Sequence, residues 1–204
     1  METSIKKTAR NLEMINTNKY EEFIMKKNLL VFLLVLTLLS VSVIAVAAET
    51  GSVTINGGSL SVVTAPVTFA EVTLTGADQT TTSTSSWTAV DPTGTGSGWN
   101  LTIIAEDFTN GDADIIDISA AGFEIQLTEP NISVTAGNTE PVSAVTSLTQ
   151  IPTTGDTALK FLSAALDTGM GTYVLAPNFS LKIPAATYAG IYNSTMTITA
   201  ASSP

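Results

Sequence analysis

Through most of residues 50–204, apolar side chains occupy every second position. The runs WNLTI at residues 99–103 and FEIQL at residues 123–127 each alternate apolar residues with polar ones. Because side chains alternate between the two faces of a strand, this pattern is typical of strands with one buried face. Shorter runs of the same kind lie at residues 53–55, 60–62, 72–74, 132–134, 179–183 and 196–198.

Turn-forming residues separate these runs, and no window of ten residues after residue 50 has helical periodicity. Many short strands without helices predict an all-β domain. We expect a single antiparallel β-sandwich of the immunoglobulin-like or Greek-key type. Residues 158–166 (ALKFLSAAL) fit either a strand or a short turn of helix, and both interpretations stay open. The hydroxyl-rich residues 80–86 (TTTSTSS) are expected to form a surface loop.

The first 48 residues indicate export. A basic start at residues 25–28, an apolar run at residues 29–44 and the small residues AVAA at 45–48 follow the order of a secretory signal. We therefore expect residues 25–48 to be a signal peptide and residues 49–204 to be a secreted domain. The alternative is a retained membrane helix, since ~20 apolar residues can cross a bilayer. Residues 1–24 add nothing that a signal needs, so we interpret them as an over-extended N-terminus.

The charge of the expected domain excludes several functions. Residues 49–204 hold two lysines, no arginine and fourteen acidic side chains, so 2 − 14 gives a net charge of −12. A surface this negative repels phosphate, which argues against a nucleic-acid partner. The whole chain has no cysteine and no histidine, which excludes disulfides, zinc sites built on those residues and histidine-dependent catalytic triads. We expect a protein that is not an enzyme and needs no cofactor.

An acidic loop around residues 106–117 is the candidate metal site. Calcium takes six to eight oxygen ligands of the kind that carboxylates supply. The spacing is not that of an EF-hand, and a solvated acidic loop is the simpler interpretation. The candidate ligands for a weak calcium site are Asp112, Asp114 and Asp117.

The most informative string is DPTGTGSGWNL at residues 91–101. Glycine at every second position allows backbone conformations closed to other residues. The strand that follows places Trp99, Leu101 and Ile103 on one face. Taken alone, a Trp-x-Leu sequence is typical of a strand that faces the core.

This longer string resembles the WxL family of bacterial surface proteins. Further matches are Gly137-Asn138, the turn and tyrosine of residues 169–173, LKIP at residues 181–184 and the segment from residue 188 to the end. The resemblance implies non-covalent attachment to peptidoglycan. One departure is that Ile198 and Ala200 stand where the family usually has its second Trp and Leu. The implied site residues are Asp91, Thr93, Gly94, Gly96, Gly98, Trp99 and Leu101 in the proximal element, and Tyr188, Tyr192, Ile198 and Pro204 in the distal element.

These observations predict a secreted, non-catalytic protein of the cell surface whose partner is a cell-wall glycan. We expect the loop at residues 91–98 to bind it, with Trp87 offering a stacking surface and Asn100 and Thr102 offering hydrogen bonds. A membrane contact is expected only through the signal segment, if that segment is not cleaved.

Two alternatives remain open. The protein could be a structural subunit of a fibre or surface layer that lends residues 51–56 to the sheet of a second copy. Against this, pairing of that segment within its own domain is the simpler expectation, because sequential strands usually neighbour each other. The protein could instead bind other surface proteins as a module of a larger complex.

Overall fold

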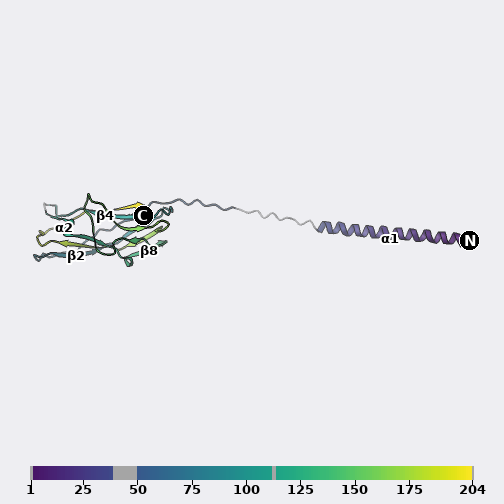
Figure 1. Cartoon of the computed structure of the whole chain (residues 1–204), viewed down its shortest axis with the longest axis horizontal. Helices are drawn as coiled ribbons and strands as arrows, with labels where there is room; N and C mark the ends of the chain where they lie inside the picture. The colour runs from purple at the N-terminus through teal and green to yellow at the C-terminus, as the bar shows by residue number, and fades with distance from the viewer. Residues whose placement is uncertain (1, 39–49, 112–113, 204) are drawn as a thin grey trace. The chain divides into compact units, whose positions relative to one another are not determined.

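The computed structural model describes residues 2–38, 50–111 and 114–203, which divide into two units, Met1–Val53 and Thr54–Pro204 (Figure 1). The described residues of the first unit include the helix α1 (Glu2–Leu38). Among the described residues, no helix combines the length and the apolar character needed to cross a membrane. The expected cleavage segment at residues 45–48 lies outside the described residues.

The second unit is built from short antiparallel strands, which confirms the prediction of an all-β sandwich. One sheet has the order β1 (Ser61–Val63), β3 (Trp87–Asp91), β12 (Gly171–Leu175) and β8 (Ile132–Gly137). A second has the order β10 (Thr149–Gln150), β7 (Phe123–Gln126), β13 (Asn178–Ile183) and β2 (Gln79–Thr84). A third has the order β14 (Met196–Ser202), β4 (Trp99–Ala105), β11 (Leu159–Ala164) and β9 (Val142–Ser143). The remaining elements are β5 (Phe108–Thr109), β6 (Ile115–Ile116), the short helix α2 (Ile118–Ala121) and a 3-10 turn at Glu129–Asn131.

The first two sheets form one continuous layer. Thr84 lies opposite Asn178 and Trp87 lies opposite Leu175, so both strands advance by three residues and the register carries through. At the junction, the Ser85 amide donates a hydrogen bond of 3.1 Å to a carbonyl of the facing strand. β2 and β3 therefore act as one long strand, and so do β12 and β13. Figure 1 shows β2 and β8 in this layer and β4 in the other.

Aromatic side chains join the two layers. Trp87 of β3 packs edge-on against Phe161 of β11, with ring centroids 5.9 Å apart. Trp99 of β4 meets Tyr173 of β12 at 6.1 Å. Along β4, buried positions alternate with half-buried ones, as the sequence period predicts. The expectation that Trp87 offers an exposed stacking surface is wrong, because this side chain is 1% exposed and fills the core.

The structure decides several expectations about local structure. Residues 80–86 do not form a loop, because residues 79–84 are strand β2 and pair with β13 over its whole length. β-branched threonine suits such a strand. Residues 158–166 contain strand β11, so the strand interpretation is confirmed.

Residues 53–55 and 72–74 form no strand. No sheet covers Val53 and Ile55, which are 82% and 86% exposed, so the expected pairing of residues 51–56 within their own domain is wrong.

Candidate functional site

A chain of side-chain hydrogen bonds shapes the loop between β3 and β4, residues 91–98. The Asp91 carboxylate accepts hydrogen bonds from the Thr93 amide at 3.0 Å and from the Thr93 hydroxyl at 2.7 Å. The Thr93 hydroxyl lies 3.1 Å from that of Thr95, which accepts a hydrogen bond of 3.0 Å from the Ser97 hydroxyl. Each bond reaches two residues along the chain. Such local bonds, which Thr, Ser and Asp form readily, fix the shape of the loop.

The alternating glycines of this loop are required by the backbone. Gly94, Gly96 and Gly98 have φ angles of 67°, 65° and 69°. This left-handed region costs other residues roughly 1–2 kcal/mol. At Gly98 there is also no space, because a Cβ would lie 2.5 Å from the carbonyl oxygen of Ala164. The sequence pattern therefore encodes a loop that passes close to the end of β11.

Trp99 ties this loop to the turn between β11 and β12. Its indole Nε1 donates a buried hydrogen bond of 2.8 Å to the carbonyl of Gly169. Gly169 has a φ of 72°, and a Cβ there would lie 2.8 Å from Trp99 Nε1. Trp99 is 1% exposed and Leu101 is fully buried. A ring this deeply buried presents no face to a ligand, so Trp99 acts as an anchor for the loop.

Two further sequence matches lie at the same end of the sandwich. The Tyr173 hydroxyl donates to the carbonyl of Thr139 at 3.2 Å, and the amide of Asn138 donates to the carbonyl of Met170 at 3.0 Å. Burial raises the pKa of Tyr173, and the nearby charges of Asp91 and Glu140 raise it further. The phenol therefore stays neutral at physiological pH. We call this region, residues 91–99, 137–139 and 167–173, the motif end.

The C-terminal strand, β14, pairs with the whole length of β4 and ends at the motif end. Ile198 lies opposite Ile103 on β4 and packs, partly buried, against the core. Beyond it, the Asn100 side chain donates a hydrogen bond of 2.6 Å to the carbonyl of Ser203. The amide of Ser203 donates to the carbonyl of Gly98 at 3.1 Å. Pro204 lies outside the described residues.

The structure does not bring the distal tyrosines to the motif end. Tyr188 and Tyr192 belong to the loop that precedes β14, at the opposite end of the sandwich, beside Phe108 and the end of β13. Tyr192 donates its hydroxyl to the carbonyl of Tyr188 at 3.1 Å. Tyr188 is 70% exposed. The distal element of the sequence is therefore divided, with its tyrosines at one end of the sandwich and the end of β14 at the other.

The acidic loop uses its carboxylates locally. Asp117 caps α2 by accepting hydrogen bonds from the amides of Ser119 at 2.9 Å and Ala120 at 3.2 Å, and the Ser119 hydroxyl lowers the pKa of Asp117. Asp114 accepts a hydrogen bond of 2.9 Å from the Asn110 side chain. Asp112 lies outside the described residues. Within the described ranges, no three acidic side chains gather as a metal site would require, and calcium binding stays a prediction.

A cavity of about 800 Å³, which the sequence patterns did not predict, occupies the end of the sandwich opposite the motif end. One wall is the irregular chain between β1 and β2, residues 65–74, which we call the strap. The other wall is the loop at residues 187–194. A signal for it was present, because two tyrosines, Tyr188 and Tyr192, follow β13.

A protein-family model described as "WxL domain surface cell wall-binding" matches residues 47–204. A comparison with curated proteins finds no match. A solved structure that matches is a family 123 glycoside hydrolase from Clostridium perfringens, described for glycolipid glycan hydrolysis. It is 19% identical, with a TM-score of 0.31, over 63% of this chain and 19% of that one. So low a TM-score says nothing about the function of the present chain.

Proposed function

The chain belongs to the WxL family of cell wall-binding surface domains, and from this we propose that it is a secreted, non-catalytic protein that attaches non-covalently to the peptidoglycan of a bacterial wall. The observation that carries the proposal is the family match over residues 47–204, which includes all of the second unit. That unit also contains the motif end, where separate parts of the family pattern meet. The family itself is one of surface-binding domains and not of enzymes.

The proposed contact surface is the outer side of the loop at residues 91–98. Pro92, Gly94, Thr95 and Ser97 are exposed there, while Asp91 and Trp99 are buried beneath them. Hydroxyls held in place before binding lose little conformational entropy when they meet a ligand. In this account the loop hydroxyls bind the polar groups of the glycan. The indole of Trp99 positions them through its bond to Gly169.

Charge constrains the target. Residues 49–204 carry a net charge of −12, so a wall rich in phosphate polymers repels the domain over a distance set by the salt concentration. We infer that the contact is with a neutral glycan, or that divalent cations bridge to an anionic one. Attachment should then strengthen when salt or calcium is added, because screening removes the repulsion.

The test is sedimentation of the full chain with purified wall sacculi at several salt and calcium concentrations. We expect the protein to pellet with sacculi, and the pelleted fraction should increase as the salt or calcium concentration is raised. The double variant Thr95→Ala/Ser97→Ala should pellet less, because it removes two exposed hydroxyls. The matched control Thr80→Ala/Thr82→Ala removes two exposed hydroxyls from β2 and should behave as the parent. A chain that stays in the supernatant under all conditions would exclude wall binding.

A specific observation supports a second candidate function, that of a fibre subunit. Val53 and Ile55 alternate along an exposed segment, and the structure gives residues 51–56 no strand partner among the residues it describes. Exposed alternating segments of this kind can add to a free sheet edge of another copy. Electron microscopy without sacculi tests this: filaments that disappear in the Val53→Asp/Ile55→Asp variant support a fibre, whereas a monodisperse parent excludes it.

A further inference from the structure

The strap is attached to the sandwich by side chains of the neighbouring strand. Its carbonyls at Ala65, Thr68 and Thr73 accept hydrogen bonds from Ser85 at 2.9 Å, Ser83 at 2.6 Å and Gln79 at 3.0 Å. The Trp87 indole also donates to the carbonyl of Ala65, at 3.2 Å. These side-chain donors hold the strap alongside β2 without making it a strand. The cavity lies between the strap and the loop at residues 187–194.

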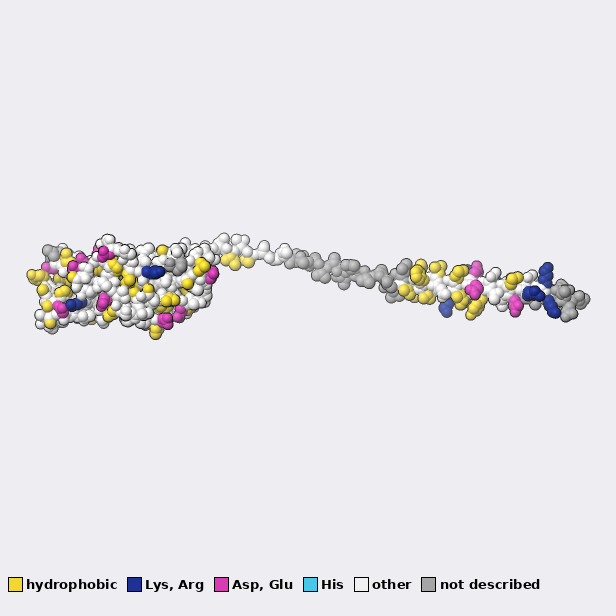
Figure 2. Space-filling view, in the orientation of Figure 1, with side chains coloured by type: hydrophobic (Ala, Val, Ile, Leu, Met, Phe, Trp, Pro, Cys, Tyr) yellow, Lys and Arg dark blue, Asp and Glu magenta, His cyan; other side chains and the backbone are white. Residues whose placement is uncertain are grey.

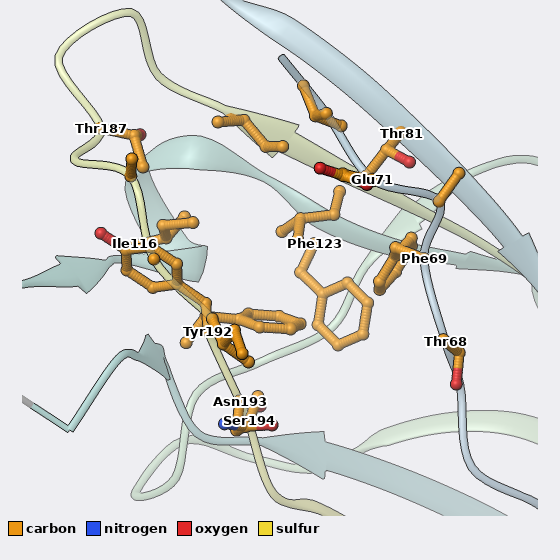
Figure 3. A pocket seen from close by; sticks show the side chains of 18 of the residues that line it. Thr68, Phe69, Glu71, Thr81, Ile116, Phe123, Thr187, Tyr192, Asn193 and Ser194 are labelled. Carbon is orange, nitrogen blue, oxygen red and sulfur yellow. The ribbon is translucent and has the colours of Figure 1, made fainter. Parts of the chain in front are cut away.

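Phe69 fixes the strap to the floor of the cavity. Its ring meets Phe108 at 6.3 Å and Phe123 at 6.2 Å, in edge-to-face contacts. Figure 3 shows Phe69 and Tyr192 on opposite walls with Phe123 between them. Leu181 and Ile116 extend the apolar floor. The interior of the cavity is thus built from the aromatic core of the sandwich.

The opposite wall is held in place by backbone bonds. Asn193 and Thr109 exchange two amide-to-carbonyl hydrogen bonds of 2.9 Å. The Ser194 hydroxyl donates to the carbonyl of Glu106 at 2.6 Å. The bond from Tyr192 to the carbonyl of Tyr188 closes the loop. The two walls are therefore positioned independently of any ligand, which favours binding at low entropic cost.

The lining combines an apolar floor with a polar rim. Thr68, Thr187, Asn193 and Ser194 supply hydroxyl and amide groups around the opening (Figure 3). Glu71 is the one charged side chain among the lining residues that the structure describes. Pockets of about 300–1,000 Å³ with an aromatic interior and a few polar groups are typical small-ligand sites. This lining suits a ligand with apolar faces and polar edges and without negative charge.

We propose that this cavity binds a short, uncharged stretch of N-acetylated glycan, with the exposed ring of Tyr188 stacked on a sugar. A sugar ring has apolar C–H faces for Tyr188 and hydroxyl edges for the rim. The acetamido methyl group suits the apolar floor. The inference rests on the proposed function, since it gives wall binding a second contact at the end opposite the loop of residues 91–98.

A smaller hollow extends the cavity beyond the tyrosines. It measures about 280 Å³ and shares Thr187, Tyr188 and Tyr192 with the main cavity, while Asp114 and Ile115 form its far side. Tyr188 and Tyr192 therefore stand between two hollows. A glycan longer than the main cavity can extend past these tyrosines into the smaller hollow. Partial burial raises the pKa of Tyr192, and the charge of Asp114 raises it further, so its phenol remains a donor.

The test titrates the full chain with the uncharged trimer of N-acetylglucosamine, followed by calorimetry and by NMR of the tyrosine rings. We expect saturable binding and shifts of the Tyr188 and Tyr192 signals. Tyr188→Ala should weaken binding about five- to ten-fold, as truncation of a binding tyrosine commonly does. Tyr188→Phe keeps the stacking ring and should bind nearly as the parent. The control Leu166→Ala changes a side chain that is 66% exposed and is not part of the cavity lining, and it should have no effect.

Parallel sedimentation with sacculi separates this inference from the proposed function. If sacculi bind the chain but the trimer does not, or if Tyr188→Ala binds the trimer as well as the parent does, the cavity proposal is overturned and wall binding stands. If the trimer binds and Tyr188→Ala weakens it while sacculi do not pellet the chain, the cavity proposal holds and the wall as target is wrong. If the parent chain binds neither the trimer nor sacculi, both proposals are overturned.

Discussion

The two ends of the sandwich differ in how much of their polar and aromatic surface is buried. At the motif end, Asp91 and Trp99 are buried and satisfy their polar groups within the protein. At the cavity end, an irregular strap replaces an edge strand, Tyr188 and Ile191 are exposed, and about 800 Å³ remains open. The motif end gives the sandwich a fixed shape, whereas the cavity end leaves room for a ligand.

This contrast separates the residues that identify the family from the residues that are free to touch a ligand. The Trp and Leu of the proximal element are core residues. Their side chains can influence binding only through the loop they support. The exposed side chains of the cavity end, such as Tyr188, can change with little effect on folding, because exposed substitutions usually alter stability by less than about 0.5 kcal/mol. Stability measurements on matched pairs from the two ends therefore test the contrast.

The largest expected effect comes from Trp99→Ala. Truncating a buried tryptophan commonly costs about 3–5 kcal/mol, whereas Tyr188→Ala should stay within about 0.5 kcal/mol because Tyr188 is 70% exposed. Urea unfolding of both variants gives the two values. Trp99→Phe keeps an aromatic ring but loses the bond to Gly169, so it should fall between them. Equal costs for Trp99→Ala and Tyr188→Ala would contradict the assignment of the two ends.

The next effect compares two glycines with nearly the same backbone. Gly169 and Gly76 have φ angles of 72° and 77°. A Cβ at Gly76 meets no atom within 4 Å, whereas one at Gly169 would collide with Ala164 and Trp99. Gly76→Ala should cost about 1–2 kcal/mol for its backbone alone. Gly169→Ala should cost roughly 1–3 kcal/mol more from overpacking.

Thermal unfolding in the presence of urea measures both glycine variants under one condition. Far-ultraviolet circular dichroism follows the unfolding of both variants. If Gly169→Ala costs no more than Gly76→Ala, the close contact between the Trp99 indole and the turn between β11 and β12 is wrong.

A smaller loss is expected when the loop at residues 91–98 loses its buried acceptor. Asp91→Ala removes the partner of the Thr93 amide and hydroxyl and should cost about 1–3 kcal/mol. Glu71→Ala removes an exposed carboxylate at the cavity end and should cost less than about 0.5 kcal/mol. Chemical denaturation of the pair checks this. A stable Asp91→Ala variant with unchanged wall binding would show that the bonds within the loop are dispensable.

The smallest expected effect depends on pH. Burial and the charges of Asp91 and Glu140 raise the pKa of Tyr173. The corresponding stability is fully present below the ordinary tyrosine pKa of about 10 and is lost as the pH rises through the higher pKa of the folded state. The melting temperature should therefore fall above about pH 10. Tyr173→Phe should reduce that fall. If the melting temperature of this variant falls with alkaline pH as much as that of the parent, the raised pKa of Tyr173 is contradicted.

A structural feature could be predicted from the sequence where a short contiguous pattern encodes it. The string of residues 91–101 predicts both the buried face of β4 and the glycine loop, and the structure shows both. The strand at residues 79–84 was missed because a run of threonine and serine carries no apolar alternation, and only its pairing with β13 makes it a strand. Residues 72–74 do alternate, yet they form no strand, and it is the Gln79 side chain of β2 that bonds to the carbonyl of Thr73.

The sequence by itself determined the all-β class, the core face of β4 and the membership of the WxL family. Each of these follows from a period of two residues or from a contiguous string. The tertiary structure alone decided that β2 and β3 continue as one strand, that Trp87 is buried and that the strap leaves a cavity beside Tyr188 and Tyr192. These features depend on contacts between residues far apart in the chain, such as Thr84 with Asn178, and no local pattern encodes which distant partners will meet.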